Sequence, residues 1–448
     1  MRELKHGKAI LGSVCMAAIL VWEVYTKLMP QNNHFFDSPS RHHLSGLNLW
    51  RNVPQTSWKP CLWWTQSAEP RMAEAGKMNG YIIIECSGGL NQMRRDLCNG
   101  IGIARLLNAT IVLPRFETSP YWNDTSGFGD IFDADFFLES VHSWVDVLRE
   151  LPTNLSMRQP VAINCHKVAS PFDYVESLLP KLLQHTVIVL RPSASQRSDR
   201  YPDSAKRARC HACFRSLRLV RRLQETADTL LERLPHPFVV LHLRFEPDMI
   251  AYSRCRYNLS SASMASINRV RGFRQVFGVA DEKSWRKKGK CPLTPQETAF
   301  ILQALNIPAS TPIYLAAGSG LLELHKLAST YTQLFQKSDF LHADRLKALK
   351  GSRRAAIDWY VSLHAYAYIA TFVGNMDKMV VSDRVLAGKH RNLVLDRHMF
   401  AEAYGQGMSE QEISKLIWKK HRHHVTSGYG SPVSDCFCRT YLTASLQE

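Results

Sequence analysis

The sequence lacks the two glycine-rich patterns that most often mark a nucleotide site. A glycine turn is present at residues 87–92, but it does not have the G-x-G-x-x-G spacing of a dinucleotide-binding fold, and no P-loop lysine pattern occurs in the chain. The sequence also contains no internal repeat. A nicotinamide dinucleotide enzyme and a P-loop NTPase are therefore not indicated.

Acidic residues are in deficit. The 448 residues include 56 Lys and Arg against 39 Asp and Glu, which gives a formal net charge of +17 at pH 7. Such a charge favours anionic partners in general, among them sugar nucleotides, acidic polysaccharides, membranes and nucleic acids. The basic residues are not interleaved with aromatic residues on any one element, which disfavours nucleic-acid binding.

A full-length apolar membrane span is also missing. The uncharged run at residues 9–22 would reach only about 21 Å as a helix, against a hydrocarbon core of roughly 30 Å. A basic tail precedes this run, and apolar residues continue to position 29. The pattern predicts a cytosolic tail at 1–8, an uncleaved signal anchor at 9–29 and a luminal remainder. A cleaved signal peptide and a cytosolic hydrophobic start are the alternatives.

Cysteine usage agrees with a luminal location. One of the 11 cysteines lies in the apolar run, and the even number that remains is compatible with disulfides of unknown pairing. A zinc site made of Cys210, Cys213, Cys436 and Cys438 is the less favoured alternative. Four Asn-x-Ser/Thr sequons give further weak support for secretion, at Asn108, Asn123, Asn154 and Asn258.

The rest of the chain alternates strand and helix patterns. Residues 30–76 are rich in polar residues and proline and predict a stem, whose tryptophans suggest that its end packs on the folded part. The alternation predicts parallel sheets in an N-terminal domain at 77–234 and a C-terminal domain at 235–448. Expected strands lie at 81–85, 110–113, 161–164, 186–190, 238–246, 312–316 and 368–372. Expected helices lie at 97–107, 207–234, 295–305, 321–330 and 355–367.

The predicted strand at 238–246 carries the most informative side chains. His242, Arg244 and Glu246 alternate with apolar residues, so they are expected on one face at the carboxyl end of a strand. A buried Arg there favours an anionic ligand, and an internal Arg244–Glu246 pair is the alternative. Asp133 and Asp135 have the spacing of a cation site, but acidic residues before an apolar run are more typical of a helix start.

The glycine turn after the first predicted strand is the second candidate for a ligand-binding site. Gly88 and Gly89 would let backbone N–H groups approach a ligand, and the helix start that follows would favour negative charge. A tight turn without any ligand is the alternative.

Five segments, taken together, resemble the plant O-fucosyltransferase family, which includes the pectin rhamnosyltransferases of glycosyltransferase family 106. They lie in the same order over about residues 78–400, and comprise residues 88–94, 104–110, 242–249, 291–297 and 313–318. The resemblance implies a GT-B-like α/β fold with two Rossmann-like domains facing a cleft. It also implies a single-pass type II Golgi membrane protein and an inverting glycosyltransferase.

The resemblance further implies a nucleotide-sugar donor, with no cofactor and no obligatory metal. The expected reaction moves fucose from GDP-fucose to a cell-wall glycan or glycoprotein. Transfer of rhamnose from UDP-rhamnose to pectin is one alternative, and a non-catalytic glycan-binding relative is another. No nucleic-acid partner is expected.

The family pattern also assigns residues. Arg244 is expected on the diphosphate and glycosidic oxygen and Asn91 near the reacting centre, while Glu246 and Asp248 are candidates for the base by residue type. The predicted catalytic residues are Arg244, Asn91 and Glu246. The predicted substrate-binding residues are Gly88, Gly89, His242, Leu243, Arg244, Asp248, Asp358, Gly374, Asn375 and Arg384.

The chain departs from the family pattern between residues 364 and 385. An acidic residue usual after the helix that contains Asp358 is missing, and Ser382-Asp383-Arg384-Val385 stands where the family has Gly-His-Arg-Arg. These changes are compatible with a divergent donor or a weakened enzyme.

Overall fold

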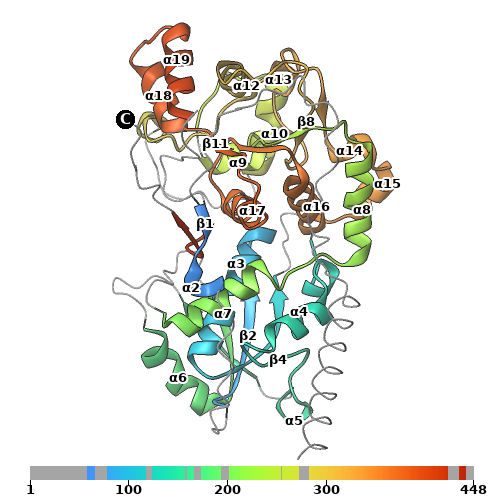
Figure 1. Ribbon diagram of the computed structural model, residues 1–448, viewed down its shortest axis with the longest axis vertical. Helices are drawn as coiled ribbons and strands as arrows, with labels where there is room; N and C mark the ends of the chain where they lie inside the picture. The colour runs from blue at the N-terminus through green and yellow to red at the C-terminus, as the bar shows by residue number, and fades with distance from the viewer. Residues whose placement is uncertain are drawn as a thin grey trace, which may run out of the picture. The chain divides into compact units, whose positions relative to one another are not determined.

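Two five-stranded parallel sheets dominate the computed structural model (Figure 1). The structure describes residues 58–65, 78–117, 124–156, 159–165, 173–192, 201–253, 255–271, 282–421 and 433–439. One sheet is built from residues before position 193 and the other from residues after position 238. The alternation of strands and helices read from the sequence is therefore present in both halves.

The first sheet has the order β4-β3-β2-β6-β5, with all neighbours parallel. Its centre is β2, whose residues Ile82, Ile83 and Ile84 are completely buried, as a strand covered on both faces requires. β6 pairs with β2 although β5 precedes it in the chain, which reverses the last two strands of a Rossmann order. The strands are β2 (Tyr81–Cys86), β3 (Thr110–Phe116), β4 (Val147–Leu148), β5 (Val161–Cys165) and β6 (Val187–Pro192).

One predicted helix of this half differs in the structure. The predicted helix at 207–234 is two helices, because the backbone of the intervening residues bonds elsewhere: Asp133 N–H donates to Arg218 O at 3.0 Å and Val220 N–H to Ile131 O at 2.9 Å. The helices are α3 (Leu90–Leu106), η1 (Phe128–Asp130), α4 (Ala134–Val141), α5 (Thr153–Ser156), α6 (Tyr174–His185), α7 (Asp203–Phe214) and α8 (Arg221–Arg233).

The second sheet has the Rossmann order, β11-β10-β7-β8-β9. Its strands are β7 (Val239–His242), β8 (Ile313–Leu315), β9 (Leu334–Phe335), β10 (Ala367–Ala370) and β11 (Asn392–Val394). The order reverses between β7 and β10, and ligands of such sheets bind at the carboxyl ends of the two strands that flank this point.

The predicted strand at 238–246 is too long, since β7 ends at His242. Beyond it the backbone leaves the ladder: Arg244 N–H donates to the Thr371 hydroxyl at 3.2 Å, and that hydroxyl donates to His242 O at 2.9 Å. The alternation of side chains nevertheless continues, because Leu243 and Phe245 are fully buried in the hydrophobic core of this half.

Eleven helices accompany the second sheet within the described residues. The helix predicted at 295–305 is present, and Thr294 and Glu297 form a capping box at its start. The predicted helix at 321–330 covers only four residues, because Glu323 adopts a left-handed φ of 52° and its carboxylate accepts hydrogen bonds from Ser260 and Ser263. The helices are α9 (Pro247–Ser253), α10 (Ser261–Arg271), α11 (Glu282–Lys287), α12 (Pro295–Ala304), α13 (His325–Ala328), α14 (Lys337–Phe340), α15 (Ala343–Ala348), α16 (Gly351–His364), α17 (Asn375–Leu386), α18 (Arg397–Gly405) and α19 (Glu410–His421).

The end of the predicted stem belongs to the folded part. β1 (Trp58–Pro60) pairs antiparallel with β12 (Phe437–Arg439), and Trp64 in α2 (Leu62–Thr65) is buried against Phe214 and Phe437. The packing expected of the stem tryptophans is confirmed. Residues 433–439, the last that the structure describes, therefore contact the first described residues.

Four disulfides are present among the described residues, Cys61–Cys438, Cys98–Cys213, Cys210–Cys436 and Cys255–Cys291. The alternative of a four-thiolate zinc site is wrong, because its four cysteines are divided among three of these bonds. Cys86 and Cys165 are buried and take part in none of these disulfides.

The predicted anchor at 9–29 lies outside the described residues. Within the ranges given above, no helix is long and apolar enough to cross a bilayer.

Candidate functional site

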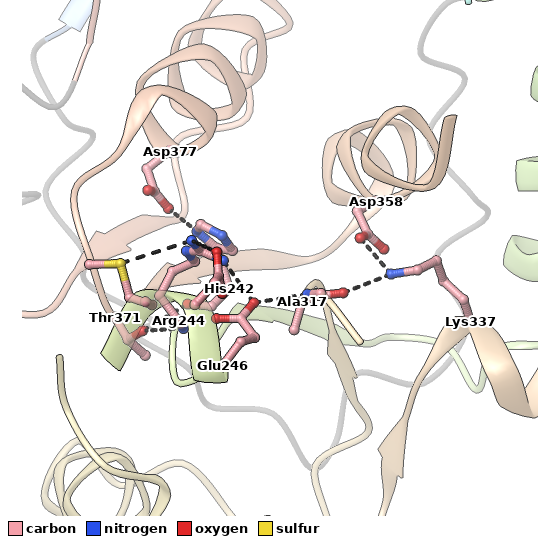
Figure 2. Close-up of polar contacts among 11 residues, drawn as sticks. His242, Arg244, Glu246, Ala317, Lys337, Asp358, Thr371 and Asp377 are labelled. Atoms are coloured by element: carbon pink, nitrogen blue, oxygen red, sulfur yellow. Dashed lines mark hydrogen bonds and ion pairs between the residues drawn. The ribbon is translucent and has the colours of Figure 1, made fainter. Parts of the chain in front are cut away.

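His242 ends β7 at the point where the strand order reverses, and Asp377 of α17 lies against it. His242 Nδ1 is 2.6 Å from Asp377 Oδ1, and both side chains are buried (Figure 2). The same carboxylate accepts from Tyr368 OH at 2.8 Å and from Gly374 N–H at 2.7 Å. One carboxylate thus joins β7, β10 and the start of α17.

Asp377 was missed by the sequence analysis. Its signal was present, because an acidic residue three positions after Gly374 is the N3 position of a helix whose N-cap is that glycine. The predicted binding residues Gly374 and Asn375 are the N-cap and first residue of α17. The structure places this helix start close to His242 through Asp377, where helix N–H groups favour an anion.

Arg244 lies two residues beyond the strand and is paired with Glu246. Its Nη1 donates to Glu246 Oε1 at 2.8 Å, and Asp248 Oδ2 lies 3.7 Å from Nη2. Burial alone would lower the pKa of Arg244, but Glu246, Asp248 and Asp377 outweigh it and raise the pKa above its ordinary value. The guanidinium stays charged, and 28% of the side chain is exposed, so it can still meet an anionic oxygen.

Glu246 is held on two sides, and its side chain is only 3% exposed. Its Oε1 accepts from Arg244 and also from Gly318 N–H at 2.9 Å, while Oε2 is buried and has no hydrogen-bond partner among the described residues. The internal pairing that the sequence left open as an alternative is therefore present. This geometry suits a group that fixes Arg244 better than one that meets an acceptor from solvent.

Asp358 of α16 lies in a neighbouring buried cluster. Its Oδ2 accepts from Lys337 Nζ at 2.6 Å and its Oδ1 from Tyr314 OH at 2.8 Å. Burial raises the pKa of Asp358, and the Lys337 ammonium and the Tyr314 hydroxyl oppose that rise. Both carboxylate oxygens accept hydrogen bonds from protein groups, so the role of Asp358 here is to hold Lys337 and Tyr314 in place.

The glycine turn caps α3. Gly88 has a φ of +87°, and a Cβ there would lie 2.4 Å from Gln92 Oε1, which itself accepts from Gly89 N–H at 3.2 Å. These two features require glycine at position 88 for the turn itself. Ser87 and Gly88 are exposed, so the loop is also open to a ligand.

Asn91 is buried in the first turn of α3 and is tied to the second half of the chain. Its Oδ1 accepts from Arg94 Nη1 at 3.3 Å, and both Arg94 terminal nitrogens lie 3.3 Å from Asp383 Oδ2. The Arg94 guanidinium also lies 4.5 Å from the centre of the Trp359 ring, and Trp359 Nε1 donates to Asp383 at 2.7 Å. Asp383 of α17 is therefore the charged partner of Arg94.

Two predicted binding residues have side chains that are directed into the protein. Leu243 is part of the hydrophobic core. Arg384 is fully buried, donates to Ser362 O at 2.7 Å and Ala365 O at 2.9 Å, and burial lowers its pKa to about 9. Both side chains therefore stabilise the second half and do not face the other predicted residues.

The two carboxylates considered as a cation site lie at the start of α4, where Asp133 is the N-cap and Asp135 pairs with Arg149. Asp133 accepts from Phe136 N–H at 3.0 Å at the start of α4 and pairs with Arg218. No cluster of three His, Cys, Asp or Glu side chains suited to a metal occurs in the part of the chain that the structure describes.

A pocket of about 220 Å³ lies elsewhere. Its lining includes Asp130 and the arginines Arg222, Arg345 and Arg353. The predicted site residues, all of which are described, do not line it.

Comparison with known proteins places the chain in a family. The family described as "GDP-fucose protein O-fucosyltransferase" matches residues 81–387. O-fucosyltransferase 13 of Arabidopsis thaliana is 46% identical over 405 residues, which cover 90% of this chain and 92% of that protein. Rhamnogalacturonan I rhamnosyltransferase 1 of Arabidopsis thaliana is 33% identical over 344 residues, which cover 72% of this chain and 68% of that protein.

Among solved structures, POFUT1 in complex with GDP-fucose is similar with a TM-score of 0.45 and 16% identity, over 72% of this chain and 99% of that one. The family match covers well over half of the chain, and the first of the two relatives matches nearly all of it. The chain therefore belongs to the GDP-fucose protein O-fucosyltransferase family, and it is a glycosyltransferase.

Proposed function

We propose that this enzyme transfers fucose from GDP-fucose to a hydroxyl of a cell-wall glycan or glycoprotein, with inversion at the sugar. The observation that carries the proposal is the cationic, partly exposed Arg244 at the carboxyl end of the second sheet. It stands beside His242 and the start of α17, at the point where the strand order reverses. That position in a parallel sheet is where a nucleotide diphosphate is expected.

The proposed mechanism rests on electrostatics. As the bond between sugar and phosphate breaks, negative charge grows on the leaving diphosphate, and a fixed guanidinium can stabilise it more in the transition state than in the ground state. The N-terminus of α17 adds a favourable dipole. Because these groups supply positive charge, we propose that no metal is required, and a chelator should leave the rate unchanged.

The acceptor hydroxyl needs a base. Of the two candidate carboxylates, Asp248 is the more accessible, with 15% of its side chain exposed against 3% for Glu246. We propose that Asp248 takes the acceptor proton and that Glu246 holds Arg244. Asp248→Asn should then lower kcat and leave donor affinity within about threefold, whereas a large loss of donor affinity would contradict the assignment.

Rhamnose transfer from UDP-rhamnose is the second candidate, because one relative is named a rhamnosyltransferase. The net charge of +17 suits an acidic pectic acceptor for either donor. If neutral oligosaccharides competed equally well at low salt, the preference for an acidic acceptor would be excluded.

The donor is tested by thermal unfolding of the full chain with GDP-fucose, UDP-rhamnose, GDP and UDP. Ligand at about 100 times its Kd stabilises a protein by about 2.7 kcal/mol. Stabilisation by one nucleotide class, lost in Arg244→Ala and kept in the exposed control Arg221→Ala, identifies the donor. Stabilisation that survives in Arg244→Ala would exclude Arg244 as the donor ligand, and binding without sugar transfer would favour the non-catalytic alternative.

The location is a proposal as well. We propose a GT-B-like enzyme anchored in the Golgi membrane by residues 9–29, with a cytosolic tail at 1–8. The domains at 77–234 and 235–448 would be luminal. Protection of a C-terminal tag from protease in intact vesicles is expected, and digestion of the tag without detergent would contradict this topology.

A further inference from the structure

The peptide group between Ala317 and Gly318, just after β8, connects a buried ion pair to a partly exposed one. Lys337 Nζ donates to Ala317 O at 2.9 Å, and Gly318 N–H donates to Glu246 Oε1 at 2.9 Å (Figure 2). The carbonyl and the N–H belong to the same planar amide. A movement of one side of this amide therefore moves the other.

The ion pairs at its two sides complete a continuous chain of contacts. On one side, Asp358 Oδ2 accepts from Lys337 at 2.6 Å, and on the other, Glu246 Oε1 accepts from Arg244 at 2.8 Å. The charges alternate along this series of contacts. It runs from the Asp358 carboxylate to the Lys337 ammonium, then through the amide to the Glu246 carboxylate and the Arg244 guanidinium. Arg244 is the most exposed of the four charged side chains at 28%, against 11% for Lys337 and 3% for Glu246.

Glu246 depends on this arrangement for its orientation. Within the described structure only its Oε1 is bonded, and Oε2 is buried with no partner, so two donors fix the carboxylate. Donation by an ammonium group to a peptide carbonyl polarises the amide and strengthens its N–H as a donor. A glycine fits at 318 because a Cβ there would lie 3.2 Å from Glu246 Oε1.

We propose that Lys337 is a positioning residue for the transfer reaction. Its ammonium group fixes the Ala317–Gly318 amide, the amide fixes Glu246, and Glu246 holds Arg244 where the leaving diphosphate forms. This inference rests on the proposed role of Arg244 as the donor ligand. Lys337 acts only through other residues and does not touch substrate.

A purely structural role of Lys337 gives a different expectation. If Lys337 served only to neutralise the buried carboxylate of Asp358, its loss would destabilise the protein by the same amount whether or not Arg244 is present. Activity would then follow the folded fraction. The two roles are separable because, among the hydrogen bonds of the described residues, Lys337 reaches Arg244 through the Ala317–Gly318 amide and Glu246.

The decisive experiment is a double-mutant cycle on the full chain, with kcat/KM for the donor as the readout. We expect Lys337→Met to lower kcat/KM about 10- to 100-fold, because a misplacement of about 1 Å can cost that much. In the Arg244→Ala background the same change should cost less than about threefold. Lys337→Arg, which keeps the charge, should recover most of the loss. Equal losses in both backgrounds would overturn the proposal.

A second variant separates stability from positioning. Lys337→Met combined with Asp358→Asn removes the unpaired buried charge and should recover much of the Tm that the single change loses. Its kcat/KM should remain low, since the Ala317 carbonyl still lacks its donor. Recovery of kcat/KM together with Tm would overturn the proposal.

A crystal structure of this double variant decides the point independently of the donor. The bond of 2.8 Å between Arg244 and Glu246 should be lost or shifted, and an unchanged arrangement would overturn the proposal. If the wild-type chain transferred neither fucose nor rhamnose, the proposed function would fail, and this structure would still test the positioning role.

Discussion

Arg94 of α3 and Asp383 of α17 form a buried ion pair between residues that are 289 positions apart in the sequence. The pair joins α3, which follows β2 of the first sheet, to α17, which follows β10 of the second sheet. Trp359 completes it, since its indole N–H donates to the carboxylate and its ring lies under the guanidinium. Asp383 lies in the segment that we expected, from the sequence, to depart from the family pattern, and its side chain there is paired with Arg94.

Removal of Asp383 should be strongly destabilising. Asp383→Leu leaves Arg94 buried without its anion, and such a loss costs about 3–5 kcal/mol. The control Arg94→Met/Asp383→Leu removes both charges and should be the more stable of the two variants. Chemical denaturation midpoints measure the difference, and a double variant less stable than the single one would show that the pair is not the source of the effect.

Arg244 should be sensitive to side-chain geometry as well as to charge. Arg244→Ala is expected to lower kcat about 100- to 1000-fold, the loss seen when one transition-state hydrogen-bond donor is removed. Arg244→Lys keeps a charge but loses the planar fork, so an intermediate loss is expected. Arg221→Lys, at an exposed residue paired with Glu225, is the matched control. Steady-state kinetics that rank Lys equal to wild type would exclude a bidentate role.

The carboxylate of Asp377 should affect both the site and the fold. Asp377→Ala removes the bond that caps α17, which is worth about 0.5–2 kcal/mol, and frees the His242 ring to turn. We expect a lower Tm together with a higher KM for the donor. Tyr368→Phe removes one bond to the same carboxylate and should lower Tm by less, with KM nearly unchanged. A KM that stays constant in Asp377→Ala would separate His242 from donor binding.

Asp96 should make stability depend on pH. Burial raises the pKa of Asp96 to about 7, against the opposing effects of the Ser87 N–H and the Arg95 charge. Between the unfolded value near 3.8 and about 7, the folded state therefore binds more protons than the unfolded state, so its contribution to stability is lost as pH rises through about 7.

The comparison with Asp96→Asn isolates this contribution, which changes by at most about 1.4 kcal/mol per pH unit. From pH 8 down to pH 5, wild type should gain stability relative to the variant. Denaturation midpoints measured at each pH provide the test, and a constant difference would show that Asp96 does not titrate in this range.

The sequence predicted that three polar side chains lie together and missed two residues that hold them in place. Alternation of polar and apolar residues placed His242, Arg244 and Glu246 together, because side-chain direction in an extended segment depends only on local geometry. Lys337 follows β9 and Asp377 follows β10. Asp377 is 135 positions from His242. The position of Asp377 after Gly374 indicates a helix cap, but nothing near either residue in the sequence indicates its distant partner. Only the order of strands in the sheet brings them together.

The same limit explains the errors in the fold. Residues 215–220 have a helical pattern, but their backbone bonds to residues 131–133, which no periodicity reveals. The short helix at 325–328 similarly reflects Glu323 binding to Ser260. Local propensity is overridden in both places by a contact that is distant in the sequence.

The bond between Cys61 and Cys438 closes 377 positions of chain into a covalent ring. A single proteolytic cut between these two cysteines should leave one molecule of unchanged mass apart from the added water, and fragments should separate only after reduction. A truncated protein that begins at residue 77 would lack Cys61, so the ring could not form and Cys438 would have no disulfide partner. Any secreted form made for study should therefore begin before Trp58.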